Sequence, residues 1–181
     1  IDPPDLVWFI KNCHKDVIFD KPDKPFLTRL VDRGFPRRQG RWCCQEYKER
    51  GGNGRFVVTG IRGKESNTRK KRKMVETCFH DKTKKYLHCI IDWSTQEVWE
   101  FIKEKELPYC KLYDEGWKRI GCLFCPFKNK KSKEIKKYPR YEEAFRVAFN
   151  KLYELHSIDR ESMKRWSSGD EMFEWWLFNT P

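Results

Sequence analysis

The spacing of apolar residues predicts helices in several parts of the chain. Residues 26–33 (FLTRLVDR) carry apolar side chains at helical intervals, and the glycine that follows is expected to end the helix. Residues 94–97 (STQE) form a capping box that begins the helix EVWEFIKEKE. A longer amphipathic helix is expected over residues 141–156, and a short one in the aromatic tail, capped near Ser168 or Asp170.

Apolar, β-branched runs predict strands between the first helices. Residues 17–19 (VIF) are expected to form a short buried strand, and residues 55–61 (RFVVTGI) a central strand. Residues 88–91 are a further expected strand. At the start of the chain, Asp2 is expected to cap a helix whose first position is Pro3. Strand, polar loop and helix in succession indicate an α/β fold, with ligands at the carboxyl ends of the strands.

The charge of the chain is strongly positive. Its 39 Lys and Arg residues exceed its 27 Asp and Glu residues, which gives a formal net charge of +12. Basic runs occupy residues 69–73 and 128–137. This charge favours a polyanionic partner, either a nucleotide, a nucleic acid or both. The alternative is a solvated basic surface with no bound partner.

Composition also narrows the class of protein. The 38% of hydrophobic residues suits a globular chain, and no apolar run reaches the length of a membrane span. No secretory signal opens the sequence, so we expect no membrane partner and a reducing, cytoplasmic compartment. The eight cysteines suit a metal site better than a disulfide scaffold, because the chain is long, lysine-rich and has CC and CxxC spacings.

Four of the cysteines occur as two pairs, Cys43–Cys44 and Cys122-x-x-Cys125. Four thiolates brought together by folding hold either zinc or an iron–sulfur cluster. Adjacent cysteines usually point apart and reach one metal centre only when that centre is large or the backbone bends, which favours a cubane cluster over zinc. The alternative is that the first pair are ordinary buried thiols. Cys78 and Cys110 are expected in loops, where either could carry sulfur, although no neighbour in the sequence indicates a lowered pKa.

Basic residues near the predicted strand ends are candidates for anion binding. Arg62 follows the run at 55–61, where its guanidinium could bind a phosphate or sulfate through two hydrogen bonds. Lys64 and Arg69 extend the same positive segment. Arg119 precedes the CxxC pair and could steer an anionic substrate toward it. Each of these residues could instead be a solvated surface charge.

Four segments in this order and spacing resemble the phosphoadenosine phosphosulfate (PAPS) reductase family: RWCCQEYK, GIRGKESNTR, IIDWSTQEVWEFI and LYDEGWKRIGCLFCPF. This family includes adenylyl-sulfate reductases and the sulfurtransferase of DNA phosphorothioation. The resemblance covers about residues 1–127 and implies an adenine nucleotide alpha hydrolase-like, Rossmann-like α/β fold. It also implies that Cys43, Cys44, Cys122 and Cys125 bind a [4Fe-4S] cluster. The GIR segment is then expected to contact the anionic end of the nucleotide, which is ATP, adenylyl sulfate or PAPS.

The sequence departs from the family pattern in two places. The phosphate loop of the Ser-Gly-Gly-Lys-Asp-Ser type is missing, so the expectation is that Ile1 falls after the family's second strand. A preceding segment or a protein partner would then supply the phosphate loop. In addition, no cysteine follows Cys125, whereas the family's reductases carry a late Glu-Cys-Gly-(Ile/Leu)-His segment. The cysteine of that segment attacks the sulfate sulfur, and thioredoxin then resolves the sulfonated intermediate.

These observations predict two parts, a PAPS reductase-like α/β domain over residues 1–127 and a helical extension packed on it over residues 128–181. The predicted function is that of an iron–sulfur, adenine-nucleotide-dependent enzyme of sulfur metabolism. A sulfurtransferase that uses ATP to activate an acceptor, plausibly a nucleic acid, fits better than a simple reductase. The alternatives are an assimilatory adenylyl-sulfate or PAPS reductase, and a noncatalytic zinc-binding module for nucleic acid.

Overall fold

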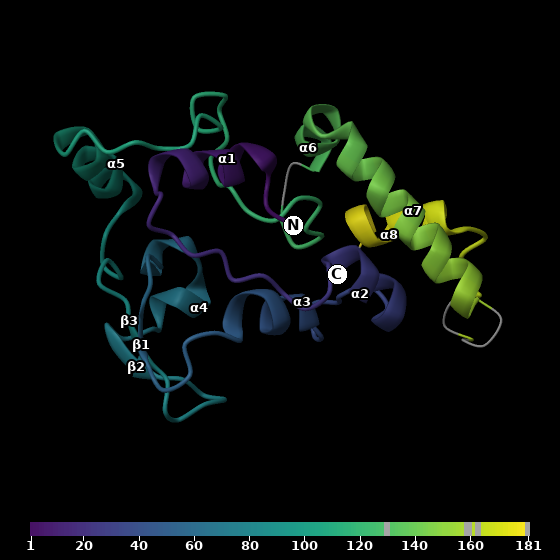
Figure 1. Ribbon diagram of the computed structural model, residues 1–181, viewed down its shortest axis with the longest axis horizontal. Coiled ribbons are helices and arrows are strands. Elements are labelled where there is room, and N and C mark those ends of the chain that lie inside the picture. Colours follow the sequence, from purple (N-terminus) through teal and green to yellow (C-terminus); the bar gives the residue numbers. More distant parts are fainter. Residues whose placement is uncertain (129–130, 158–160, 162–163, 180–181) are drawn as a thin grey trace. The chain divides into compact units, whose positions relative to one another are not determined.

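The computed structural model describes residues 1–128, 131–157, 161 and 164–179. The chain divides into two compact units. Figure 1 labels their helices and strands. The helical unit comprises Ile1–Tyr47 and Cys110–Pro181, and the sheet unit comprises Lys48–Tyr109. None of the helices in the described ranges is long and apolar enough to cross a membrane.

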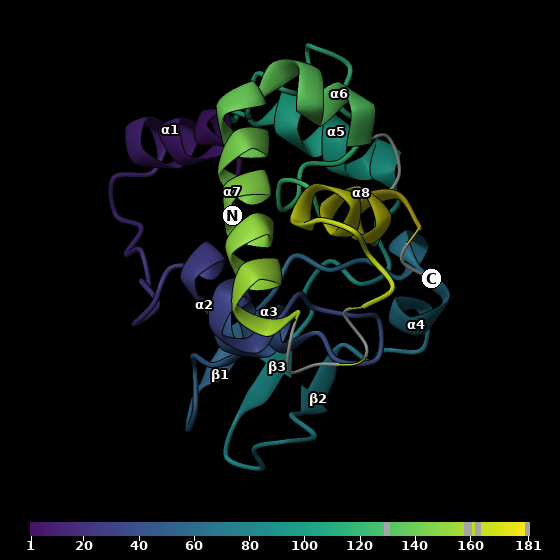
Figure 2. The same cartoon turned by 90° about the vertical axis from the view of Figure 1, so that its right-hand side faces the viewer.

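The helical unit is formed by segments from both ends of the chain. Its helices are α1 (Pro4–Cys13), α2 (Phe26–Arg33), α3 (Trp42–Cys44), α6 (Lys131–Lys137), α7 (Pro139–His156) and α8 (Gly169–Asn179). A π-helical turn, η1 (Gln45–Glu49), follows α3 directly. Helix α7 packs against both α2 and α8, as Figure 2 shows for the neighbouring green and yellow helices.

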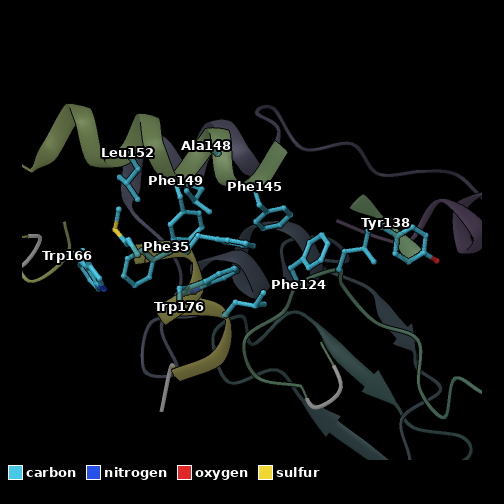
Figure 3. Close-up of a cluster of buried hydrophobic side chains, with 14 of the residues drawn as sticks. Phe35, Phe124, Tyr138, Phe145, Ala148, Phe149, Leu152, Trp166 and Trp176 are labelled. Carbon is cyan, nitrogen blue, oxygen red and sulfur yellow. The ribbon is translucent and has the colours of Figure 1, made fainter. Parts of the chain in front are cut away.

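The core of this unit lies along the inner face of α7. Phe145, Phe149 and Leu152 are fully or almost fully buried there (Figure 3). The rings of Phe145 and Phe149 contact those of Phe173 and Trp176 on α8. These side chains recur at the three- and four-residue intervals expected of one helix face. The predicted helix at 141–156 is confirmed in type, with its start at Pro139.

The two C-terminal helices approach each other closely where α8 begins. A Cβ atom placed on Gly169 would lie 2.3 Å from the Cα atom of Asn150 on α7, so only glycine fits there without displacing the backbone. Ser168 caps α8, because its hydroxyl oxygen accepts the Glu171 backbone N–H at 3.1 Å. This confirms the expected helix cap near Ser168 or Asp170.

The sheet unit contains three short strands and three helical segments. They are β1 (Phe56–Val58), η2 (Gly63–Glu65), α4 (Asn67–Lys70), β2 (Val75–Thr77), β3 (Lys85–Leu87) and α5 (Thr95–Glu104). The strand order is β1-β3-β2, with β3 parallel to β1 and antiparallel to β2. The described residues therefore form a small mixed α/β protein. Helix α5 begins with the predicted capping box, in which Ser94 and Glu97 exchange hydrogen bonds.

Several strand predictions were wrong. Residues 17–19 form no strand, and Ile18 is 92% exposed, because a β-branched run forms a strand only where another strand pairs with it. The run at 55–61 yields a strand of three residues at one edge of the described sheet, not a central strand.

The strand expected at residues 88–91 and the first helix cap also differ from the prediction. The strand lies three residues earlier, at Lys85–Leu87, and the chain turns at Ile91, whose N–H donates to the His88 carbonyl at 3.1 Å. Helix α1 begins at Pro4, with Pro3 at the cap position and no capping side chain. The α2 prediction is confirmed at both ends.

Candidate functional site

The first cysteine pair lies on a short helix that aromatic contacts hold against α2. Cys43 and Cys44 follow Trp42 in α3. The Trp42 indole N–H donates to the Gly34 carbonyl at 3.2 Å, and its ring stacks on Phe26 with centroids 5.5 Å apart. A helix of three residues has little stability of its own, so these contacts determine where the two thiols stand.

Ion pairs add a second anchor just after this cysteine pair. Glu46 of η1 pairs with Arg29 at 3.3 Å and also with Arg33, both on α2. These side chains are partly exposed, so each pair contributes on the order of 0.2–1 kcal/mol. The Tyr47 hydroxyl donates to the Lys24 carbonyl at 2.9 Å. The chain is therefore held to α2 on both sides of the two cysteines.

The second cysteine pair lies in a turn stabilised by a buried carboxylate. Phe124, between Cys122 and Cys125, has a positive φ of 51° and a fully buried side chain. Its backbone N–H donates to Glu134 Oε2 at 2.8 Å. Glu134 is only 1% exposed and also forms an ion pair with Lys128. A strained backbone position of this kind persists only where its surroundings hold it.

The two cysteine segments meet through aromatic side chains. Phe124 packs on Phe145 of α7 with centroids 5.2 Å apart, and Phe26 packs on the same ring at 5.8 Å (Figure 3 shows Phe124 and Phe145). On the other side, the Arg41 guanidinium lies 4.5 Å from the centroid of the Phe127 ring. Residues just before the first pair therefore contact residues just after the second.

The other three paired cysteines lie close enough to Cys43 to influence the ionisation of its thiol. A hydrogen bond with the Cys44 thiol, together with burial, raises the pKa of Cys43 above its ordinary value. The negative charge that Cys44, Cys125 and Cys122 carry as thiolates acts in the same direction. Four thiolates in such a site repel one another, and a bound cationic centre would remove the repulsion.

The four cysteine thiols have the chemistry of metal ligands, but their arrangement in the structure is not that of a site for one metal ion. Thiolates are ligands of both zinc and iron–sulfur clusters. Among the described residues, however, no group of three or more His, Cys, Asp or Glu side chains is arranged to hold one metal ion. The sulfurs are thus near one another without the close convergence that a tetrahedral zinc site has. That the four cysteines bind a cluster stays a prediction.

In the sheet unit, polar side chains follow the parallel strands β1 and β3 at their carboxyl ends. Thr59 Oγ1 lies 2.6 Å from His88 Nδ1, where these two strands end. His88 is buried, and its Nε2 atom lies 3.6 Å from Glu76 Oε2, slightly beyond hydrogen-bond distance. Arg62 follows Thr59 closely in the chain, and its guanidinium donates a hydrogen bond to Thr95 Oγ1 at 3.0 Å. Parallel α/β sheets bind ligands at this edge.

Glu65 lies between two of the predicted anion-binding residues. Its carboxylate lies 3.5 Å from Arg62 Nε and also pairs with Arg69. Ser66 caps α4, because its hydroxyl oxygen accepts the Arg69 backbone N–H at 3.2 Å. In the structure Ser66 is a cap, and an incoming phosphate would compete with Glu65 for both arginines.

The other two predicted anion-binding residues lie in different units. Lys64 is exposed in the sheet unit, and its charge is one of the smaller causes that lower the pKa of Glu97, after the hydrogen bonds with Ser94. Arg119 is exposed in the helical unit, three residues before Cys122. The structure therefore brings Arg62, Lys64 and Arg69 into one unit and places Arg119 in the other. Their role in binding a nucleotide stays a prediction.

One feature that sequence reasoning missed is the environment of Cys78. A hydrogen bond from the Asp81 backbone lowers the pKa of the Cys78 thiol, and the Tyr86 hydroxyl, the His80 backbone and the Lys84 charge act in the same direction. Tyr86 Oη lies 3.7 Å from the sulfur. No residue type in the sequence indicates this turn, because the largest cause of the lowered pKa is a hydrogen bond from a backbone amide.

The match to a known family agrees with the residues described above. The sequence model of the phosphoadenosine phosphosulfate reductase domain matches residues 16–128, which include both cysteine pairs and the Arg62 segment. The chain belongs to this family.

Curated relatives include enzymes named for sulfate reduction. The chain is 33% identical to adenosine 5′-phosphosulfate reductase of Allochromatium vinosum over 117 residues, which is 62% of this chain and 44% of that protein. It is 28% identical to the enzyme of the same name from Oceanobacillus iheyensis over 113 residues, 58% of this chain and 46% of that protein. An uncharacterized protein of Methanocaldococcus jannaschii is 26% identical over 151 residues, 77% of this chain and 32% of that protein. The chain thus spans less than half the length of these relatives.

Proposed function

We propose that this chain forms part of an iron–sulfur, adenine-nucleotide-dependent enzyme of sulfur metabolism, with residues 1–127 as its catalytic domain and residues 128–181 as a helical extension. The proposal is supported by two cysteine pairs that both lie inside the family match and by the packing of Phe26 and Phe124, from the two cysteine-bearing segments, on the same Phe145 ring. Cys43, Cys44, Cys122 and Cys125 would hold a [4Fe-4S] cluster. When bound, that cluster supplies redox capacity to the helical unit.

The residues around the thiols prepare the site for an anionic substrate. Glu134 fixes the turn between Cys122 and Cys125, and the Arg41 guanidinium stands beside the first pair on the Phe127 ring. In the sheet unit, Arg62 would bind the anionic end of the nucleotide at the carboxyl ends of the parallel strands. A nucleotide that displaces Glu65 from Arg62 and Arg69 would exchange one carboxylate for phosphate oxygens of greater charge.

The proposed reaction is sulfur transfer to an acceptor that ATP activates. An acceptor oxygen attacks the α-phosphorus of ATP and pyrophosphate leaves; sulfide then attacks the adenylylated acceptor, forms the acceptor–sulfur bond and displaces AMP. The high positive charge of the chain supports a polyanionic acceptor of the nucleic-acid class.

One observation favours the reductase as a second candidate function. A reductase needs a thiolate that attacks the sulfate sulfur and forms a sulfonated cysteine while AMP leaves. Cys78 has a lowered pKa, so its thiolate is more available than that of an ordinary cysteine. Two of the relatives described above carry the reductase name.

The test measures the centre and the reaction separately. Full-length protein purified without oxygen should contain about four iron and four acid-labile sulfide per chain, and Cys43→Ser or Cys125→Ser should lower both. One zinc and no sulfide would instead support the noncatalytic zinc-binding module. Pyrophosphate release with ATP and an acceptor should then exceed thioredoxin-dependent sulfite release from adenylyl sulfate or PAPS. Rapid sulfite formation that Cys78→Ser abolishes would establish the reductase.

A further inference from the structure

A surface turn in the helical unit carries arginines that stack on aromatic rings. Arg37 and Gly40 close the turn through two backbone hydrogen bonds, at 3.0 and 3.4 Å. The turn lies directly before α3, and therefore directly before the first cysteine pair. Its arginines are exposed, yet rings hold their guanidinium groups in place: Arg37 lies 5.4 Å from the Phe35 centroid, and Arg38 lies 5.9 Å from that of Phe127.

A further arginine joins this surface from the C-terminal part of the chain. The Arg165 guanidinium lies 3.9 Å from the Trp166 ring centroid and 4.0 Å from that of Trp175. Burial lowers the pKa of Arg165, and the positive charge of Arg37 lowers it further. Phe35 contacts both tryptophans, with centroids 5.8 and 6.2 Å apart. The two arginines therefore share one aromatic cluster and repel each other.

These cations lack the carboxylates that usually accompany surface arginines. We name the set the arginine strip, and it consists of Arg37, Arg38, Arg41 and Arg165. Within the described ranges, no Asp or Glu forms an ion pair with any member. An arginine that stacks by its face on a ring keeps its in-plane N–H groups free for hydrogen bonds to an anion. The strip thus presents pre-oriented donors without a partner from the described chain.

Arg146 of α7 also lies against an aromatic ring, but its hydrogen-bond donors are paired with carboxylates. It also stacks on a ring, 5.1 Å from the Phe173 centroid. Its donors, however, are taken by three carboxylates, Glu142 at 2.9 Å, Asp170 at 3.0 Å and Glu174 at 3.2 Å. The difference between Arg146 and the strip is therefore the missing anion and not the stacking.

We propose that the arginine strip binds the phosphate backbone of a nucleic acid and leads it to the cysteine pairs. Several unpaired guanidinium groups spread along one turn suit a ligand with repeated phosphates, since a single phosphate cannot contact all of them. Mutual repulsion between Arg37 and Arg165 is relieved when phosphates lie between or beside them. The inference deepens the proposed function by locating the surface that binds its acceptor, but binding can be measured without any sulfur chemistry.

The experiment measures the affinity of the full-length protein for fluorescein-labelled oligonucleotides by anisotropy over a series of salt concentrations. Single-stranded DNA, single-stranded RNA and duplex DNA are compared. The variants are Arg41→Gln and the double variant Arg37→Gln/Arg165→Gln. Arg146→Gln is the matched control, because it removes a stacked arginine and one charge without removing a free donor. Melting temperature and iron content are recorded for each protein.

The double variant should bind at least one of the three oligonucleotides about tenfold or more weakly, and its slope of log affinity against log salt should fall by about one for each phosphate that the variant no longer neutralises. Arg146→Gln should stay within about twofold of the parent, a difference that long-range charge alone accounts for. If the double variant does not fold, Arg38→Gln/Arg41→Gln carries the same expectation, since both residues are exposed.

Three results would overturn the inference. The strip variants could bind every oligonucleotide with unchanged affinity and salt slope. Free ATP or inorganic triphosphate could compete with equal strength per molecule, which would make the strip a site for a free nucleotide. Loss of binding to anionic phospholipid vesicles, with oligonucleotide binding intact, would identify a membrane surface as the ligand. If anaerobically purified protein contains no iron and takes none up on reconstitution, yet binds the oligonucleotides, this inference stands while the proposed cluster is refuted.

Discussion

The buried carboxylate of Glu134 allows a sharp test of how the CxxC turn is held. Its Oε2 atom accepts the Phe124 backbone N–H at 2.8 Å, and the residue is 1% exposed. Lys128 pairs with the same carboxylate and has a side chain that is 20% exposed. Glu134→Ala removes the acceptor and leaves the Phe124 N–H buried with no partner that the described residues supply.

The magnitude follows from these contacts. A hydrogen bond to a charged acceptor contributes about 1.5–3 kcal/mol, and a buried donor left unpaired loses all of it. The loss of the ion pair costs less at Lys128, because its side chain can turn toward water and its amino group already lies 3.5 Å from the Gly121 carbonyl. We therefore expect Glu134→Ala to lower the free energy of unfolding of the helical unit by about 3 kcal/mol. Glu134→Gln keeps an oxygen for the Phe124 N–H and should cost about 1 kcal/mol.

The assay combines urea unfolding, followed by tryptophan fluorescence, with iron and sulfide analysis after anaerobic reconstitution. Glu143→Ala, at an exposed position of α7, is the matched control and should change neither quantity. Glu134→Ala should lose both stability and bound iron. An unfolding midpoint equal to that of the parent would refute the energetic argument. Lower stability with full iron content would show that the turn geometry does not control the cysteine site.

Four further predictions follow from single contacts. Gly169→Ala should destabilise the helical unit by about 2 kcal/mol in urea unfolding, because the new methyl group meets the backbone of α7 at 2.3 Å. Cys78 should react with iodoacetamide at lower pH than a free cysteine, as mass spectrometry of each peptide over a pH series would show, since its pKa is lowered. Arg62→Ala should weaken nucleotide binding by about 1.5–3 kcal/mol in calorimetry, whereas Glu65→Gln, which frees the arginines, should strengthen it. Hydrogen bonds with Asn150 and Arg146 lower the pKa of Asp170 in the folded protein. The stability that Asp170 contributes is therefore fully present above the carboxyl pKa of the unfolded chain and is lost as the pH falls through its pKa in the folded protein. Asp170→Asn should flatten that part of the curve of unfolding free energy against pH.

Local sequence signals determined the helices well. The α2 boundaries, the capping box of α5 and most of α7 were predictable, because caps and helical periodicity act within a few residues. The strands were harder, since pairing decides where a strand forms. The run at 17–19 has strand-forming residues without a pairing partner, whereas the polar segment Val75–Thr77 becomes β2 because β3 lies beside it.

For the candidate site, the sequence by itself determined which residues to examine. Residue type, spacing and motif order selected the four paired cysteines, the Arg62 segment and the family. The sequence could not show that the Glu65 carboxylate forms ion pairs with Arg62 and Arg69, or that backbone amides lower the pKa of Cys78. Such partners are set by the path of the backbone, and nothing in the residue types fixes that path.

Only the tertiary structure decided how the two cysteine pairs come together. Phe26 from the N-terminal part and Phe124 from the CxxC turn pack on one ring, Phe145 of α7, and this shared burial brings distant segments to one place. The same packing leaves Arg37 and Arg165 on a common aromatic cluster. Hydrophobic burial is non-directional, so it can join any apolar segments of suitable shape, and the sequence alone does not say which ones it joins.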